Sequence, residues 1–238
     1  MDHGTAITPV STRGAVPPFY VMELVKAAAR RAESHGDVIA LNVGQPATPA
    51  PREVLDAAHA ALESGALGYT EALGLASLRE AIAGHYAAWY GVAVEPGTIA
   101  VTTGSSAAFT AIFLAAFDPA DVVVVTRPGY PAYRNTLAAL GCEVVELDCG
   151  PEVRYQPTVE QLDAVAGRLG APPRGLVLAS PANPTGTVID PAELARIGSW
   201  CRDAGCLLIS DEIYHGITFG GSRAVSALEA APGAAVIG

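Results

Sequence analysis

The strongest constraint on the fold of this chain is an alternation of short, apolar runs with longer stretches of helical periodicity. Most of the runs are apolar throughout, which is typical of parallel strands buried on both faces. Strands that alternate with helices in this way form βαβ units. The sequence therefore predicts an α/β fold with a three-layer, doubly wound, mostly parallel sheet. The six predicted strands cover residues 99–103, 122–126, 142–147, 175–179, 207–210 and 234–237.

Several of the intervening helices have recognisable ends. Thr158 with Gln161 fits a capping box, in which each residue's side chain bonds the other's backbone N–H. Asp190 precedes a proline at the first position of a helix that is expected to stop at Gly205. The amphipathic segment 19–35 precedes every predicted strand. We therefore expect two parts: an arm and helix of a smaller domain over residues 1–40, and a large domain, itself incomplete, over 41–238.

Composition excludes several classes of function. The 238 residues contain 24 acidic and 14 basic side chains, for a net charge of −10, which argues against a nucleic-acid partner. The four cysteines match neither a zinc pattern nor a disulfide framework, so we expect reduced thiols in the core. No signal-peptide pattern and no run of about 18 apolar residues is present. These features predict a cytoplasmic protein without a membrane partner.

In open α/β sheets, ligands bind at the carboxyl ends of the strands, so the residues that follow each run are of interest. The first run is followed by Gly104, Ser105 and Ser106 and then by an apolar helix over 107–117. A helix N-terminus with two hydroxyl groups suits a phosphate group. An ordinary serine N-cap on a buried helix is the alternative.

Three further strand ends carry polar or aromatic residues. Tyr130 lies between Gly129 and Pro131, and could stack on a flat ring or simply pack in a rigid loop. Asn183 lies between two prolines, which restrict the directions in which its amide can point. Asp211 directly follows the buried apolar run 207–210, so it needs good donors or a cation, such as one of the 13 arginines.

Taken together and in order, these motifs resemble the class I/II pyridoxal-phosphate-dependent aminotransferases of the aspartate aminotransferase superfamily. Each motif is modest alone, but their order along the chain is specific. The resemblance implies a pyridoxal 5′-phosphate cofactor and the large-domain fold of this superfamily. It rests on Gly44-Gln45-Pro46, Tyr69-Thr70 with Gly74, Leu78 and Arg79, Gly104-Ser105-Ser106, Pro128-Gly129-Tyr130-Pro131, Asn183-Pro184-Thr185-Gly186 and Asp211-Glu212-Ile213-Tyr214.

The resemblance assigns catalytic roles to three residues. Asp211 would bind the pyridine nitrogen and favour the protonated ring, which lets the cofactor accept electrons. Asn183 and Tyr214 would both hydrogen-bond the phenolic oxygen of the ring. His215, beside Tyr214, could line the pocket or could be an ordinary packed or solvated histidine.

The resemblance also assigns binding roles. Tyr130 would stack on the ring, and Ser105 and Ser106 would hold the phosphate. Tyr69 would reach the phosphate in the neighbouring subunit of a homodimer. Gly44, together with Asn183, would lie where the substrate carboxylate binds.

The chain departs from the family at the lysine that forms a Schiff base with the cofactor. The only lysine is Lys26, in the N-terminal segment, and the sequence ends at Gly238, where the family's lysine would soon follow. The family's phosphate-binding and substrate-binding arginines are not matched either. We therefore expect a truncated chain with weak or no activity of its own.

The leading hypothesis is an aminotransferase that moves an amino group between an amino acid and a 2-oxo acid. A pyridoxal-phosphate-dependent β-lyase or decarboxylase of the same fold is an alternative, since the cofactor residues do not select the bond that breaks. A non-catalytic protein that binds the cofactor is the other alternative, because the lysine is absent. The residues do not identify the amino donor.

Overall fold

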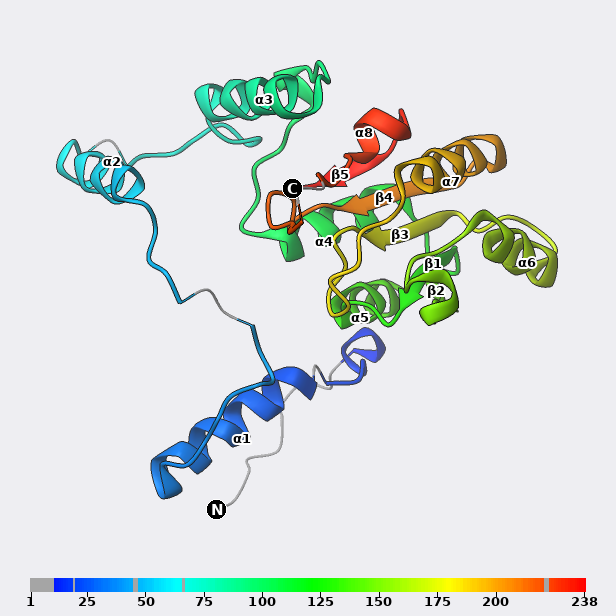
Figure 1. Cartoon of the computed structure of the whole chain (residues 1–238), viewed down its shortest axis with the longest axis horizontal. Coiled ribbons are helices and arrows are strands. Elements are labelled where there is room, and N and C mark those ends of the chain that lie inside the picture. Colours follow the sequence, from blue (N-terminus) through cyan, green and yellow to red (C-terminus); the bar gives the residue numbers. More distant parts are fainter. Residues whose placement is uncertain (1–10, 19, 45–46, 66, 221–222) are drawn as a thin grey trace. The chain divides into compact units, whose positions relative to one another are not determined.

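A computed structural model describes residues 11–18, 20–44, 47–65, 67–220 and 223–238 of the chain. The chain divides into two compact units, Pro18–Leu75 and Ala76–Gly238, with the described residues before Pro18 joining the second (Figure 1). The domain boundary predicted at residue 40 stays a prediction.

The unit Pro18–Leu75 contains two helices, α1 (Tyr20–His35) and α2 (Arg52–Glu63). The helix predicted over 19–35 is confirmed from Tyr20 onward, and residue 19 lies outside the described part. Neither helix has a buried residue. Helices of this kind depend on packing rather than on propensity for most of their stability.

The larger unit contains a five-stranded sheet in the order β2-β1-β3-β4-β5, with every pair of neighbouring strands parallel. The predicted α/β fold is therefore confirmed. Short 3-10 turns cover Thr12–Gly14, Pro96–Thr98 and Pro151–Val153. The remaining elements in chain order are α3 (Ala76–Tyr90), α4 (Ser105–Ala116), β1 (Val122–Arg127), α5 (Pro131–Leu140), β2 (Glu143–Asp148), α6 (Val159–Leu169), β3 (Gly175–Ala179), α7 (Pro191–Ala204), β4 (Leu207–Asp211), α8 (Ala227–Ala230) and β5 (Ala235–Ile237).

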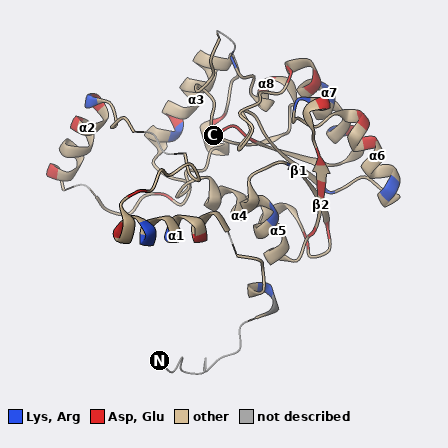
Figure 2. Cartoon of the chain, turned by 60° about the horizontal axis from the view of Figure 1, so that its bottom comes forward, with Lys and Arg blue, Asp and Glu red and all other residues tan. Residues whose placement is uncertain are grey.

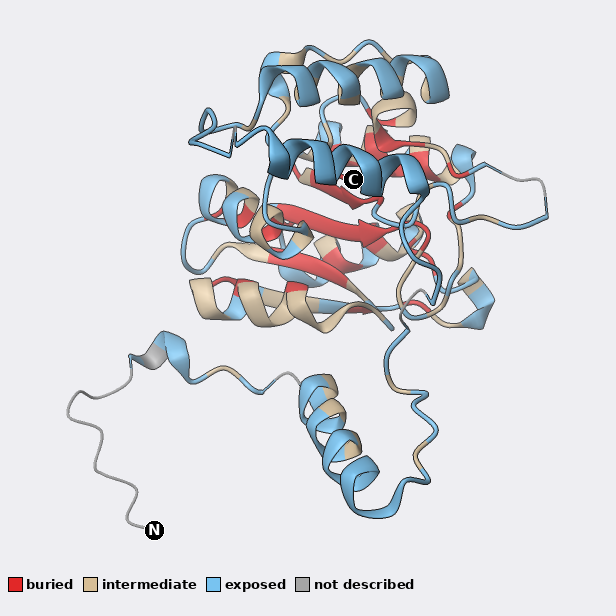
Figure 3. Cartoon of the chain, turned by 90° about the vertical axis from the view of Figure 1, so that its left-hand side faces the viewer, coloured by how far each residue is buried: buried red, intermediate tan, exposed pale blue. Residues whose placement is uncertain are grey.

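Helices cover both faces of the sheet and bury it, as Figure 3 shows. Successive residues of a strand point to opposite faces, so each strand contributes to two separate cores. One core lies under α4 and α5, and the other under α6, α7 and α8. The first contains Phe109, Phe113, Val123, Val125, Leu137, Val177 and Ile209. The second contains Val124, Leu162, Leu176, Leu178, Leu194, Ile197, Leu208 and Ala227.

Five of the six predicted strands are present within one residue of their expected ends, but the predicted strand over 99–103 is wrong. The backbone at Ile99 is extended, with φ −98° and ψ 131°. No described strand pairs with this segment, and the outer edge of β5 pairs with none either. An apolar run can predict an extended backbone, whereas a strand also needs a hydrogen-bonded neighbour.

The predicted helix ends are confirmed. Thr158 Oγ1 accepts from the Gln161 N–H at 3.4 Å, and Gln161 Oε1 accepts from the Thr158 N–H at 3.1 Å. Asp190 Oδ1 accepts from the Ala192 N–H at 2.9 Å. Gly205 ends α7 with φ +67°, a conformation that glycine adopts without strain.

Charged side chains lie mainly on the helices and loops, and the central strands carry few (Figure 2). In the described part of the chain, no helix is both long enough and apolar enough to cross a bilayer. The four cysteines are free and buried, as predicted. Among the described residues, Asp211 and Glu212 are the only buried charged side chains, and both lie at the end of β4.

The core under α5 gives a prediction about stability. Leu137 is fully buried, so Leu137→Ala should lower the free energy of unfolding by about 2–5 kcal/mol. Leu114 on α4 is 62% exposed, so the matched change Leu114→Ala should cost no more than about 0.5 kcal/mol. Denaturant unfolding measures both. Equal losses for the two variants would contradict this packing.

Candidate active site

The carboxyl ends of the central strands meet at one edge of the sheet. Ala179 at the end of β3 pairs with Asp211 at the end of β4, and Asp211 pairs with Ile237 of β5. The loop that carries Asn183 follows β3, and the turn that carries Tyr214 follows β4. Parallel pairing thus brings three segments, far apart in the sequence, to the same edge.

Asp211 is buried with neutral partners. Asp211 is 4% exposed, and its Oδ2 accepts a hydrogen bond from Tyr133 Oη at 2.5 Å. Oδ1 accepts from the Ile213 N–H at 3.1 Å. No described lysine, arginine or histidine forms an ion pair with it, so the alternative of an arginine partner is not what the fold provides. Burial raises the pKa of Asp211, and the two hydrogen bonds oppose that rise.

Tyr133 is a residue of this site that the sequence did not reveal. It lies in the first turn of α5, is 3% exposed and donates its hydroxyl proton to Asp211. Burial and then the Asp211 carboxylate raise its pKa, so it stays protonated. Tyr130 and Tyr214 make smaller contributions to the raised pKa of Tyr133.

Tyr130 is the N-cap residue of α5 and is half-buried. Its ring packs edge-on against the Tyr133 ring, with centroids 5.6 Å apart and an interplanar angle of 80°. Phe109, one turn into α4, also meets the Tyr133 ring edge-on, at 4.9 Å and 83°. These ring contacts join the start of α4 to the start of α5 beside Asp211.

The start of α4 differs from an ordinary serine-capped helix. The helix begins at Ser105, and its N-cap is Gly104, which has φ +83° and no side chain. Ser105 and Ser106 are therefore the first helical residues rather than caps. A first turn without a side-chain cap suits an anion, because its N–H groups point along the positive end of the helix dipole.

Asn183 and Tyr214 point toward each other. Asn183 Nδ2 lies 3.5 Å from Tyr214 Oη, and Tyr214 is 38% exposed. The loop that carries Asn183 is closed by a hydrogen bond from the Ala182 N–H to the Thr187 carbonyl at 2.9 Å. β4 ends at Asp211, and Tyr214 follows three residues later in a turn.

Two predicted site residues lie in the other compact unit. Tyr69 and Gly44 are both exposed there, so their predicted roles stay predictions. Residues 45–46 of the Gly44 motif lie outside the described part. Lys26 is exposed on α1 and forms an ion pair with Glu23 at 2.9 Å. Among the described residues, no cluster of histidine, cysteine or acidic side chains suits a metal ion.

Comparison with known proteins identifies the family. The family model for aminotransferase class I and II matches residues 36–237. The chain belongs to this family. The resemblance seen in the sequence motifs is therefore confirmed, and so is the fold expected from it.

Relatives of known name agree with this assignment. Valine–pyruvate aminotransferase of Mycobacterium tuberculosis is 52% identical over 217 residues, which are 91% of this chain and 55% of the relative. Aspartate aminotransferase of Geobacillus stearothermophilus is 34% identical, over 87% of this chain and 52% of the relative. A crystal structure of an aminotransferase from Mycobacterium tuberculosis superposes with a TM-score of 0.90 at 51% identity, and covers 96% of this chain and 58% of that one. The chain thus spans about half the length of these aminotransferases.

The burial of Asp211 gives a prediction about pH. Because burial raises its pKa, ionisation of Asp211 disfavours the folded state. The stability contributed by the protonated carboxyl is complete below the ordinary carboxyl pKa and is lost as the pH rises through the raised pKa. Asp211→Asn stays neutral at every pH. It should therefore gain on the order of 1 kcal/mol of unfolding free energy at pH 7, and nothing near pH 3.

Chemical denaturation across this pH range measures the difference. Asp203→Asn is the control, because Asp203 is exposed near the end of α7. The unfolding free energies of wild type and Asp203→Asn should agree within about 0.5 kcal/mol at every pH. A constant offset between wild type and Asp211→Asn at all pH values would contradict the assignment.

Proposed function

We propose that this chain binds pyridoxal 5′-phosphate and serves the transfer of an amino group between an amino acid and a 2-oxo acid. The observation that carries the proposal is Asp211, a buried carboxylate at the carboxyl end of β4 whose described partners are neutral. A buried carboxylate is costly without a positive partner. A protonated pyridine ring would supply that partner.

The other donors and acceptors at this edge fit the same cofactor. Asn183 Nδ2 and Tyr214 Oη lie 3.5 Å apart, and both can donate a hydrogen bond. Two such donors suit a phenolic oxygen in its anionic form. The first turn of α4, with the Ser105 and Ser106 hydroxyls, suits a phosphate group. Tyr130 offers an aromatic ring for the face of the cofactor ring.

Each residue then has a task that its position supports. When bound, the cofactor supplies an electron-accepting ring that stabilises negative charge on the substrate's α-carbon. Asp211 keeps a proton on the ring nitrogen, and Tyr133 holds the Asp211 carboxylate in place from α5. Asn183 and Tyr214 would hydrogen-bond the phenolic oxygen, and Asn183 would also face the substrate carboxylate.

The amine that moves the substrate's α-proton is a separate requirement. The only lysine of the sequence, Lys26, is exposed and paired with Glu23 on α1. We therefore assign cofactor binding and orientation to these 238 residues, and not the proton-transfer step. Valine and pyruvate are the first substrates to test, because a relative named for them is 52% identical.

The proposal also includes a cytoplasmic homodimer in which Tyr69 reaches the neighbouring subunit's cofactor. Four free, buried cysteines are compatible with a reducing compartment. The dimer rests on the family resemblance alone. A β-lyase or decarboxylase would use the same cofactor residues, so product analysis is needed to separate these reactions.

Cofactor binding gives the first test. Titration with pyridoxal phosphate, followed by the absorption of the cofactor, should show saturable binding to the chain. Asp211→Asn should weaken it about 10- to 100-fold, because it removes a charge-assisted hydrogen bond to the ring. Asp203→Asn is the exposed control. Equal affinities for wild type and both variants would contradict the assigned role of Asp211.

Amino-group transfer gives the second test, performed on the protein expressed from its complete reading frame. With pyridoxal phosphate, valine and pyruvate, we expect alanine to form at the rate at which valine is consumed. Asn183→Ala should lower this rate about 10-fold or more, because the phenolic oxygen loses a donor. Release of ammonia or carbon dioxide without alanine would instead indicate a lyase or a decarboxylase.

A further inference from the structure

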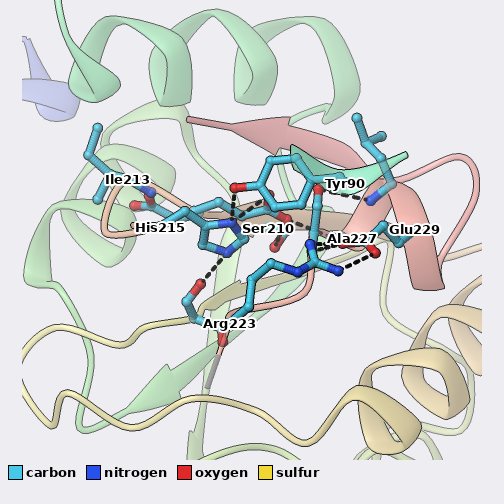
Figure 4. A network of polar contacts seen from close by, with 12 residues as sticks. Tyr90, Ser210, Ile213, His215, Arg223, Ala227 and Glu229 are labelled. Atoms are coloured by element: carbon cyan, nitrogen blue, oxygen red, sulfur yellow. Dashed lines mark hydrogen bonds and ion pairs between the residues drawn. The ribbon is translucent and has the colours of Figure 1, made fainter. Parts of the chain in front are cut away.

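A second polar network lies next to the candidate site, and the proposed function does not use it (Figure 4). Its centre is His215, the residue after Tyr214, whose side chain is 9% exposed. His215 Nε2 lies 2.9 Å from the Ser180 carbonyl oxygen, and Nδ1 lies 2.8 Å from Tyr90 Oη on α3. Both ring nitrogens therefore have a partner from a distant part of the chain.

The two partners determine the tautomer of His215. A carbonyl oxygen can only accept, so Nε2 must carry the proton that is donated to Ser180. Nδ1 is then the acceptor for the Tyr90 hydroxyl. Burial lowers the pKa of His215, which favours this neutral form. The neutral ring satisfies both of its nitrogens, whereas a protonated ring would present a second donor to Tyr90.

Glu212 is the buried carboxyl group of the network. It is 3% exposed, and its Oε1 accepts from Ser210 Oγ at 3.0 Å and from the Ala227 N–H at 2.7 Å. Its Oε2 has no hydrogen-bond partner among the described residues and lies 3.6 Å from His215 Nδ1. Burial raises the pKa of Glu212. The carboxyl group thus anchors the end of β4 to the first turn of α8 and faces the imidazole.

The remaining charged and titratable groups around His215 come from α3 and from the segment before and within α8. Arg223 and Glu229 form an ion pair at 2.9 Å, and the Arg223 guanidinium lies 5.2 Å from the centroid of the Tyr90 ring. Burial, and after it the Glu212 carboxylate, raises the pKa of both Tyr86 and Tyr90. The Arg223 guanidinium therefore packs over the face of the Tyr90 ring, and the Tyr90 hydroxyl bonds His215.

The network connects the two segments that carry the candidate cofactor ligands. Ser180 begins the loop that presents Asn183, and His215 directly follows Tyr214. The hydrogen bond from His215 to Ser180 therefore joins these segments close to the point where Asn183 and Tyr214 meet, at 3.5 Å. Backbone bonds hold the main chain here, from the His215 N–H to the Glu212 carbonyl at 2.8 Å and from the Ser180 N–H to the Asp211 carbonyl at 3.1 Å. The His215 side chain adds a bond between the two segments beyond the end of the strands.

We propose that His215 is a positioning residue that holds Asn183 and Tyr214 in register, with Tyr90 and Glu212 setting its orientation. It acts through these two residues and does not itself touch the cofactor. The role rests on the proposed function, because it concerns the residues assigned to the phenolic oxygen. It goes beyond that function by assigning a task to a histidine, a tyrosine and a glutamate outside the binding site.

Two substitutions of His215 separate this role from a general packing role. His215→Gln places an amide N–H near the position of Nε2, so the bond to Ser180 can form. His215→Asn is shorter and places its amide near Nδ1, so that bond is lost. We expect pyridoxal phosphate affinity within about 3-fold of wild type for Gln and about 10-fold weaker for Asn. His59→Gln, on the exposed helix α2, is the control.

Thermal unfolding of the same variants shows whether each one folds. A packing role alone would lower both midpoints and leave the affinities of the folded Gln and Asn variants equal, which would overturn the inference. Equal binding by wild type and His215→Asn would overturn it too, and would leave the proposed function intact. Absence of binding by the wild-type chain would contradict the proposed function itself, and the inference with it.

Tyr90→Phe provides a test that does not depend on folding of the His215 variants. In the wild-type chain, nitrogen NMR of labelled histidine should show the Nε2–H tautomer for His215. Tyr90→Phe should shift the Nδ1 resonance, because it loses its donor, and should weaken cofactor binding a few-fold. Tyr155→Phe, with a partly exposed ring, should do neither. An Nδ1–H tautomer in the wild type would overturn the inference.

Discussion

The candidate site depends on one constraint, which is the burial of a carboxylate at the end of β4. A carboxylate that is removed from water needs donors, and the fold supplies Asp211 with the Tyr133 hydroxyl and the Ile213 N–H. Both donors are neutral, so they hold the side chain in place without cancelling its charge. The arrangement is costly for the fold alone, and a buried group that the fold tolerates at such a cost is typical of functional sites.

The alternation of side chains along β4 explains why Asp211 and Glu212 form hydrogen bonds on opposite faces of the sheet. Ile209 and Asp211 point to the face covered by α4 and α5, where Asp211 meets Tyr133. Leu208 belongs to the core on the other face, and Glu212 meets the first turn of α8 on that side. The two successive acidic residues therefore serve different tasks. We propose Asp211 for the cofactor, whereas Glu212 joins the end of β4 to the first turn of α8.

Periodicity and end signals predicted much of the fold, because they report local physics. Continuous apolar runs indicated five of the strands, and the capping residues at Thr158 and Asp190 marked helix starts correctly. The run over 99–103 failed for a physical reason, since strand formation needs a partner that no local pattern reveals. Tyr133 was missed because an aromatic residue in the first turn of a helix is far more often an ordinary core side chain.

The sequence by itself determined the α/β class, the family, and the set of polar residues that follow the strands. These properties depend on residue type and order, which do not change when the chain folds. Only the tertiary structure decided which of those residues meet. Parallel pairing brought Asp211 beside the loop of Asn183, and helix packing selected Tyr133 and Tyr90 as partners for Asp211 and His215. Hydrogen bonds between residues as far apart as positions 90 and 215 depend on distances in space, and no local pattern records those distances.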